Sequence, residues 1–222
     1  MILIFDLDDT LYDESTYVMS GLRAVADFGS QTFGWDADHS FKQLCTLLKN
    51  NGRGSVFDDW LMSHEQFSKK LVMQCLHIYR HHKPAITITR ETREILQSLR
   101  EIYPLYIVTD GHKVVQKKKI DALSIASIFK RVFITHRFGI HNAKPSLHCF
   151  NLIRYAECVE WDELVYVGDN PAKDFVNLNQ VGAKTIRVLT GMHSNVLAKP
   201  NHDAKISIPN LNSLSASLLN RI

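Results

Sequence analysis

Short apolar segments alternate with helical patterns through most of this sequence, and this alternation limits the folds open to the chain. The segments expected as strands are residues 1–6, 105–108, 131–135, 164–167, 184–188 and 205–208. Strands buried on both faces of a parallel sheet read as continuous apolar runs. Because helical patterns separate most of them, the sequence predicts an α/β fold with a parallel sheet between two layers of helices, a Rossmann-like three-layer core.

The alternation is interrupted once, after the first strand. Residues 14–82 carry apolar positions at helical spacing and no strand pattern. We therefore expect an all-helical insertion over residues 13–83, with residues 1–12 and 84–222 forming the α/β core. Pro145 and Pro171 are each expected to open a helix of that core, since proline is favoured in a first helical turn.

Composition excludes several classes of protein. The 222 residues carry 26 basic and 23 acidic side chains, a net charge of +3 that cannot attract nucleic acid by bulk charge. There is no apolar run of transmembrane length and no pattern typical of a signal peptide, so a cytoplasmic protein is expected, with no membrane partner. The four cysteines form no C-x-x-C pair and are expected to be buried free thiols. The oligomeric state is not readable from the sequence.

Acidic residues follow three of the predicted strands. Asp6 and Asp8 follow the first, Asp110 follows the second, and Asp169 follows the fourth, with Asp174 five residues further on. The carboxyl ends of parallel strands meet at one edge of the sheet, where such folds bind ligands. Crowded carboxylates repel one another by several kcal/mol unless a cation lies among them. Oxygen ligands without His or Cys favour Mg²⁺.

A magnesium site of this kind usually binds substrate phosphate as well. The side chains of Thr109 and Lys144 are expected to hold phosphate oxygens, because both donate hydrogen bonds. The backbone N–H groups of the loop at Leu7 and Asp8 can do the same. The strand ends therefore predict a combined site for Mg²⁺ and phosphate.

Four short motifs in this order resemble those of the haloacid dehalogenase superfamily, and in particular its subfamily I phosphatases. They are Asp6-x-Asp8-x-Thr10, Thr109 after an apolar strand, Lys144-Pro145, and Gly168-Asp169-x-x-x-x-Asp174. The resemblance covers the α/β core, and the helical insertion is similar in place and size to the C1-type cap of that superfamily.

The resemblance implies a role for each matching residue. Asp6 would attack phosphorus to form an aspartyl-phosphate, and Asp8 would act as general acid and then general base. Thr109 and Lys144 would stabilise the transferring phosphoryl group. Mg²⁺ would be bound by Asp6, the Asp8 region and Asp169, with Asp174 either a ligand or a residue that orients ligands and Lys144. Dehalogenases of the superfamily lack the second aspartate, so Asp8 favours phosphoryl transfer.

The function that the resemblance implies is hydrolysis of a small phosphomonoester, a sugar phosphate or nucleoside monophosphate, with Mg²⁺ as cofactor. A helical cap would restrict the substrate to small molecules. Two alternatives stay open. One is a phosphomutase or phosphotransferase with the same intermediate, and the other is a binding protein that keeps the fold without activity.

Three sequence features have two interpretations each. Asp110 and Gly111 offer backbone N–H groups to phosphate. The Asp110 carboxylate, where many relatives have Asn, could meet a hydroxyl or cation on the substrate, or could cap the following helix or order the loop. Arg53, between Gly52 and Gly54, either contacts substrate or lies in a helix connector. The lysine run 117–119 is expected to be a solvated helix face rather than a nucleic-acid patch.

Overall fold

A computed structural model describes the whole chain, Met1–Ile222. The chain divides into two compact units, one formed by Met1–Glu14 with Thr87–Ile222 and the other by Ser15–Ile86. None of the helices is both long and apolar enough to cross a lipid bilayer.

The first unit is built on a six-stranded sheet in which every neighbouring pair is parallel. The strand order is β3-β2-β1-β4-β5-β6, which confirms the predicted Rossmann-like α/β core. The order reverses direction at β1, the first strand, which lies between β2 and β4. The strands are β1 (Ile2–Phe5), β2 (Leu105–Thr109), β3 (Arg131–Ile134), β4 (Leu164–Gly168), β5 (Lys184–Val188) and β6 (Ile206–Ile208).

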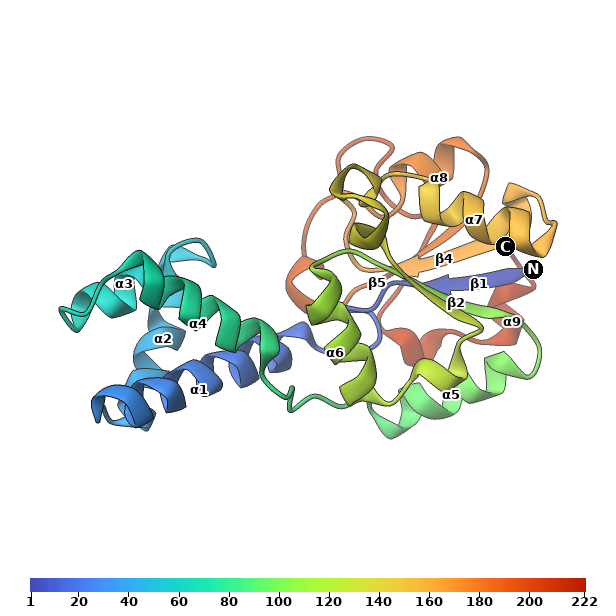
Figure 1. Cartoon of the computed structure of the whole chain (residues 1–222). Helices are drawn as coiled ribbons and strands as arrows, with labels where there is room; N and C mark the ends of the chain where they lie inside the picture. The colour runs from blue at the N-terminus through green and yellow to red at the C-terminus, as the bar shows by residue number, and fades with distance from the viewer. The chain divides into compact units, whose positions relative to one another are not determined.

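Helices cover both faces of this sheet, with α7 and α8 on one side and α5 and α9 on the other (Figure 1). Alternate residues of the central strands, such as Ile2 and Ile4 of β1, pack into one apolar cluster with Phe150 of α7 and Leu178 of α8. The strands are buried on both faces, which explains their continuous apolar sequence. The helices of this unit are α5 (Arg90–Arg100), α6 (Lys113–Leu123), α7 (His148–Glu157), α8 (Val176–Gln180) and α9 (Ala216–Leu219).

The second unit is entirely helical and has its own core. Trp60 is fully buried there among aliphatic side chains such as Leu22, Val25 and Leu44. Asp36 and Ser68 cap two of the helices by accepting hydrogen bonds from the backbone N–H three residues on. The helices are α1 (Glu14–Phe33), α2 (Ala37–Asn51), α3 (Val56–Ser63) and α4 (Lys69–His81).

Neither proline opens a helix as predicted. After Pro145 the chain turns, and α7 begins only at His148. Pro171 lies in a turn in which the Asn170 side chain accepts a hydrogen bond from the Ala172 N–H. In that turn the Asp174 N–H donates to the Asn170 carbonyl, and α8 begins at Val176. Side-chain hydrogen bonds of this kind compete with the helix, and here they shape the loop that contains Asp174.

Candidate active site

The register of the three central strands places their carboxyl ends level with one another. Phe5 of β1 pairs with Ile107 of β2 and with Val167 of β4. Asp6 and Asp169 therefore follow adjacent strands at the point where the strand order reverses. In open α/β sheets this reversal creates a crevice that binds ligands.

Three carboxylates meet at this point. Asp6, Asp169 and Asp174 each offer an oxygen atom within 4.8 Å of those of the other two, and all three residues are buried. Gly168 makes room for the group, because a Cβ atom at this position would lie 2.6 Å from Asp174 Oδ2. The Asn170 N–H donates to that same oxygen at 2.9 Å, which fixes Asp174 at the end of its turn.

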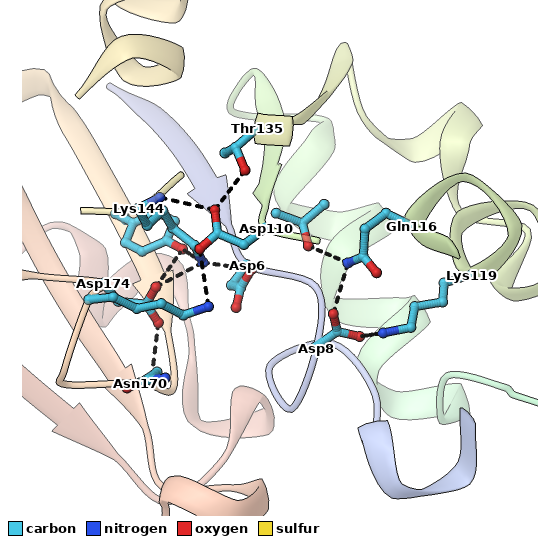
Figure 2. A network of polar contacts seen from close by, with 12 residues as sticks. Asp6, Asp8, Asp110, Gln116, Lys119, Thr135, Lys144, Asn170 and Asp174 are labelled. Atoms are coloured by element: carbon cyan, nitrogen blue, oxygen red, sulfur yellow. Dashed lines mark hydrogen bonds and ion pairs between the residues drawn. The ribbon is translucent and has the colours of Figure 1, made fainter. Parts of the chain in front are cut away.

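Lys144 lies among these acids and its side chain is almost fully buried. Its Nζ atom is 2.8 Å from Asp6 Oδ1 and 2.8 Å from Asp174 Oδ1. It also donates to the Tyr166 hydroxyl at 2.8 Å, and that hydroxyl donates to Asp174 Oδ1 at 3.3 Å (Figure 2). Lys144 thus makes three polar contacts, which satisfy a buried ammonium group.

Burial and neighbouring charges shift the pKa values of Asp6, Asp169 and Lys144. Burial raises the pKa of Asp6 to about 6, although the ammonium of Lys144 opposes that shift. Burial also raises the pKa of Asp169 to about 8, and the negative charges of Asp6 and Asp174 add to the effect. Burial alone would lower the pKa of Lys144, but Asp174 and Asp6 hold it well above its usual value. The site is therefore short of positive charge at Asp169.

This donor set suits a hard divalent cation. Asp169 is 3% exposed and lies beside two other acids. A cation bound there would neutralise that repulsion, and carboxylate oxygens are the ligands that Mg²⁺ prefers. Both oxygens of Asp174 already accept hydrogen bonds from within the protein.

Asp8 lies apart from this cluster. Its Oδ1 accepts hydrogen bonds from the Tyr12 hydroxyl and from Lys119 Nζ, each at 2.7 Å, and its Oδ2 accepts one from Gln116 Nε2 at 2.8 Å. Gln116 Nε2 also donates to Thr109 Oγ1 at 2.7 Å. The Asp8 side chain is therefore not part of the three-acid group, which leaves the backbone of the Asp8 region as the part of this residue expected to bind Mg²⁺.

The Asp110 carboxylate is held by groups of the protein itself. It does not cap the following helix, whose N-cap is His112. Instead Oδ1 accepts hydrogen bonds from the Lys144 N–H at 3.0 Å and the Thr135 hydroxyl at 2.7 Å, and Oδ2 lies 3.1 Å from Lys173 Nζ. Burial would raise the pKa of Asp110, but Lys144 and Lys173 hold it below its usual value. Asp110 orders the loop that presents Lys144.

The remaining predicted residues lie in three places. Leu7 is fully buried between Asp6 and Asp8, so only its backbone can reach a ligand. Gly111 lies between Asp110 and the start of α6. Arg53 lies between α2 and α3 in the helical unit and is exposed.

Sequence reasoning missed the polar residues that support this site from inside the fold. Tyr166 and Thr135 look like ordinary strand residues, and Lys119 was expected to be solvated but is 2% exposed. Gln116 is 1% exposed, and it lies three residues before Lys119, so both lie on the same face of α6. The helical spacing of Gln116 and Lys119 could have indicated that these two polar side chains share a contact. The adjacent Lys117 and Lys118 instead favoured the interpretation of a solvated helix face.

A match to a known family agrees with this geometry. Residues 3–188 match the model of the family described as haloacid dehalogenase-like hydrolase. The chain belongs to this family of hydrolases, which confirms the resemblance of the four motifs.

Several proteins with known names or structures are similar over most of the chain. A Methanocaldococcus jannaschii protein named glyceraldehyde 3-phosphate phosphatase is 28% identical over 220 residues, 96% of this chain and 92% of that protein. A Pyrococcus abyssi protein of the same name is 28% identical, over 83% of this chain and 79% of that one. A 2-haloacid dehalogenase structure from Pseudomonas syringae has a TM-score of 0.65 at 21% identity, with both chains fully covered. The HAD-hydrolase YfnB from Bacillus subtilis, bound to magnesium, has a TM-score of 0.67 at 18% identity, with 94% of each chain covered.

Proposed function

We propose that this protein is a Mg²⁺-dependent phosphatase that hydrolyses a small phosphorylated metabolite through an aspartyl-phosphate on Asp6. The observation that carries the proposal is the contact of Lys144 with Asp6 inside a buried group of acids at the strand ends. An ammonium beside a carboxylate at a ligand-binding edge suits the transfer of a charged phosphoryl group. The two relatives named glyceraldehyde 3-phosphate phosphatase support a small phosphate ester as substrate.

Asp6 is the proposed nucleophile. A carboxylate oxygen of Asp6 forms a bond to phosphorus while the bond from phosphorus to the leaving alkoxide oxygen breaks. Asp8 donates a proton to that alkoxide, then accepts a proton from the water that attacks phosphorus and releases Asp6 and phosphate. The position of Asp8 two residues from Asp6, outside the three-acid group, supports this division of roles.

Other groups hold the phosphoryl oxygens. Lys144 Nζ and the Thr109 hydroxyl are the side-chain donors, and the backbone N–H groups of Leu7, Asp8, Asp110 and Gly111 complete the set. These donors are fixed before substrate binds, because Asp110 anchors the Lys144 backbone and Gln116 anchors Thr109. Donors fixed in advance stabilise developing charge without reorganisation.

Asp6 and Asp169 would hold Mg²⁺, together with backbone of the Asp8 region. When bound, the ion neutralises charge on the phosphate oxygens. Asp174 lies in the same group, but its hydrogen bonds to Asn170 and Tyr166 and its ion pair with Lys144 favour an orienting role.

We further propose that the helical unit is a C1-type cap that restricts the site to small molecules, and that Arg53 contacts the substrate. A guanidinium group is well suited to a second anionic or hydroxylated group of a metabolite. Replacing Arg53 with alanine should lower kcat/KM on the best substrate and leave p-nitrophenyl phosphate turnover unchanged. Unchanged kcat/KM on both substrates would remove Arg53 from the site.

The main proposal is tested by measuring phosphate release from a panel of sugar phosphates and nucleoside monophosphates. Glyceraldehyde 3-phosphate is tested first. Asp6→Asn should lower turnover by at least about 10³-fold, because the covalent route is lost. Lys144→Met should lower it by about 10²–10³-fold, as expected for one stabilising donor. The control is Asp162→Asn, an exposed carboxylate that precedes β4 at the opposite end of the sheet.

The same panel separates the alternatives. EDTA should abolish phosphate release and Mg²⁺ should restore it. Isomer formation without free phosphate would indicate a phosphomutase, and no turnover of any substrate would favour a binding protein. Wild-type activity in the Asp6→Asn variant would overturn the mechanism.

A further inference from the structure

The Asp8 carboxylate is held by donors that the proposed chemistry leaves unused. Tyr12, Gln116 and Lys119 together donate three hydrogen bonds to its two oxygens. The last two side chains extend from the helix that follows β2, on the side of Asp8 away from the three-acid group (Figure 2). A carboxylate with donors on both oxygens has little freedom to rotate.

Burial of Lys119 needs an explanation beyond packing. Its side chain is 3% exposed and contacts Asp8 Oδ1 at 2.7 Å and Glu14 Oε1 at 3.0 Å. Burying an ammonium costs free energy that ion pairs only partly offset, so an apolar side chain would fill this position with less penalty. Two residues earlier, Lys117 is 55% exposed and pairs with the similarly exposed Asp121, so the same helix also offers a lysine position that is open to solvent. The burial of the Lys119 ammonium is therefore explained by its contacts with the Asp8 and Glu14 carboxylates.

Gln116 connects Asp8 to the second strand end. It is 1% exposed, and its single Nε2 group donates both to Asp8 Oδ2 and to Thr109 Oγ1. The distance between the Asp8 carboxylate and the Thr109 hydroxyl is thus set by one amide group. Thr109 is a proposed ligand of the phosphoryl oxygens, so the amide positions Asp8 relative to the phosphoryl group.

We propose that Lys119 and Gln116 are positioning residues that hold the Asp8 carboxylate in line for proton transfer to the leaving oxygen. This inference rests on the proposed function, in which Asp8 transfers that proton. Neither residue contacts the phosphoryl group in this scheme; Lys119 acts through Asp8, and Gln116 acts through Asp8 and Thr109. A general acid works only within hydrogen-bond reach of its target, and a misplacement of about 1 Å can reduce the rate by about 10²-fold.

The leaving group provides a test that a purely structural role would not pass. An alkoxide needs a proton to depart, whereas p-nitrophenolate is stable enough to leave without one. In Lys119→Met, kcat for an alkyl phosphate should fall by about 10-fold to 10²-fold with KM changed less than about twofold. The rate of the first p-nitrophenolate burst from p-nitrophenyl phosphate should change less than about threefold, because that step needs no proton from Asp8 and only the later hydrolysis of the aspartyl-phosphate does. The matched control Lys117→Met, on the same helix, should leave both values unchanged.

A double-mutant comparison locates the effect at Asp8. Asp8→Asn should lose alkyl phosphate turnover and keep the p-nitrophenolate burst, and adding Lys119→Met to it should cause no further loss, because the residue that Lys119 positions is already disabled. Gln116→Met should lower alkyl phosphate turnover more than the burst, which also falls because Gln116 anchors Thr109; this variant keeps the test available if Lys119→Met does not fold. In Lys119→Ala, added propylamine should restore alkyl phosphate turnover.

The possible failures are distinguishable. If Asp8→Asn hydrolyses alkyl phosphates at the wild-type rate, the proposed function fails. If Asp8→Asn loses alkyl phosphate turnover and keeps the burst while Lys119→Met loses neither, or loses both equally, the positioning role is wrong. If Glu14→Gln reproduces the effects of Lys119→Met on both measurements, Lys119 serves only to anchor Glu14.

Discussion

Two lysines of this chain are charged groups inside the protein, and their surroundings explain why each is tolerated. Lys144 contacts two acids and a tyrosine hydroxyl, and Lys119 contacts Asp8 and Glu14. Removing a partner from such a group is more damaging than removing the whole interaction, because the remaining charge stays buried without compensation. At the scale of the residue, then, the proposed function and the stability of the fold would depend on the same contacts.

Asp110 offers a test at this scale, since all its contacts are within the protein. Asp110→Asn should lower the free energy of unfolding by about 1–3 kcal/mol at neutral pH, because it loses charge-assisted hydrogen bonds to Lys144, Thr135 and Lys173. Since the native pKa of Asp110 is lowered, the ionised form stabilises the fold above the unfolded pKa. That contribution is lost as pH falls through the native value.

Urea unfolding of wild type and Asp110→Asn at a series of pH values measures this difference. The gap between the two proteins should stay constant above about pH 5 and narrow below about pH 4. The exposed Asp162→Asn variant should show no such gap. A gap that widens on acidification would contradict the assigned contacts.

At the scale of the element, two helices end in the same way with different residues. Cys158 follows α7 with a φ of 53°, and Gly182 follows α8 with a φ of 89°. In both cases the backbone N–H of the next residue returns to a carbonyl five residues earlier. This left-handed ending favours glycine, which has no Cβ to strain the backbone.

Substitutions at Cys158 and Gly182 should change the free energy of unfolding in opposite directions. Cys158→Gly should raise the free energy of unfolding by about 0.5–1 kcal/mol by relieving left-handed strain. Gly182→Ala should lower it by about 1 kcal/mol through backbone strain alone, since no atom lies within 4 Å of the added Cβ. Urea unfolding of both variants checks the pair. Equal effects of the same sign would show that the local conformation does not control stability at these ends.

At the scale of the whole molecule, the strand order brings distant parts of the chain to one point. Asp6 and Asp174 are more than 160 residues apart in the sequence. Oxygen atoms of Asp6, Asp169 and Asp174 nevertheless lie within 4.8 Å of one another. Such a concentration of charge works against folding when no cation is present. The free energy of unfolding of the whole chain should therefore depend on divalent cations.

We expect Mg²⁺ to raise that free energy, by about 2.7 kcal/mol at a hundredfold excess over its dissociation constant. Without the ion, the native state binds protons that the unfolded state releases, because the pKa values of Asp6 and Asp169 are raised to about 6 and about 8. Stability should then fall as pH rises from about 4 to 8. Asp169→Asn should be more stable than wild type in EDTA and should gain less from Mg²⁺. Thermal unfolding with and without the ion measures both effects.

The sequence was sufficient to predict the class of fold and the edge of the sheet at which the candidate site lies. Apolar runs such as Leu105–Val108 occur because these strands are buried on both faces. The strands can therefore be recognised in the sequence without knowing which segments pair with them. The sequence also predicted that the acids following β1 and β4 lie close together, since neighbouring parallel strands end at the same edge of the sheet. The helical character of residues 14–82 also followed from spacing alone.

The loops and the supporting contacts depended on tertiary structure. Pro171 permits a helix by local preference, but hydrogen bonds to Asn170 form a turn instead. Asp110, Gln116 and Lys119 are polar residues whose partners lie far away in the chain, so no local pattern shows whether they face solvent or one another. Burial and pairing are properties of the folded arrangement. The sequence determined which chemical groups reach the strand ends, and only the tertiary structure decided how each is oriented and by what it is held.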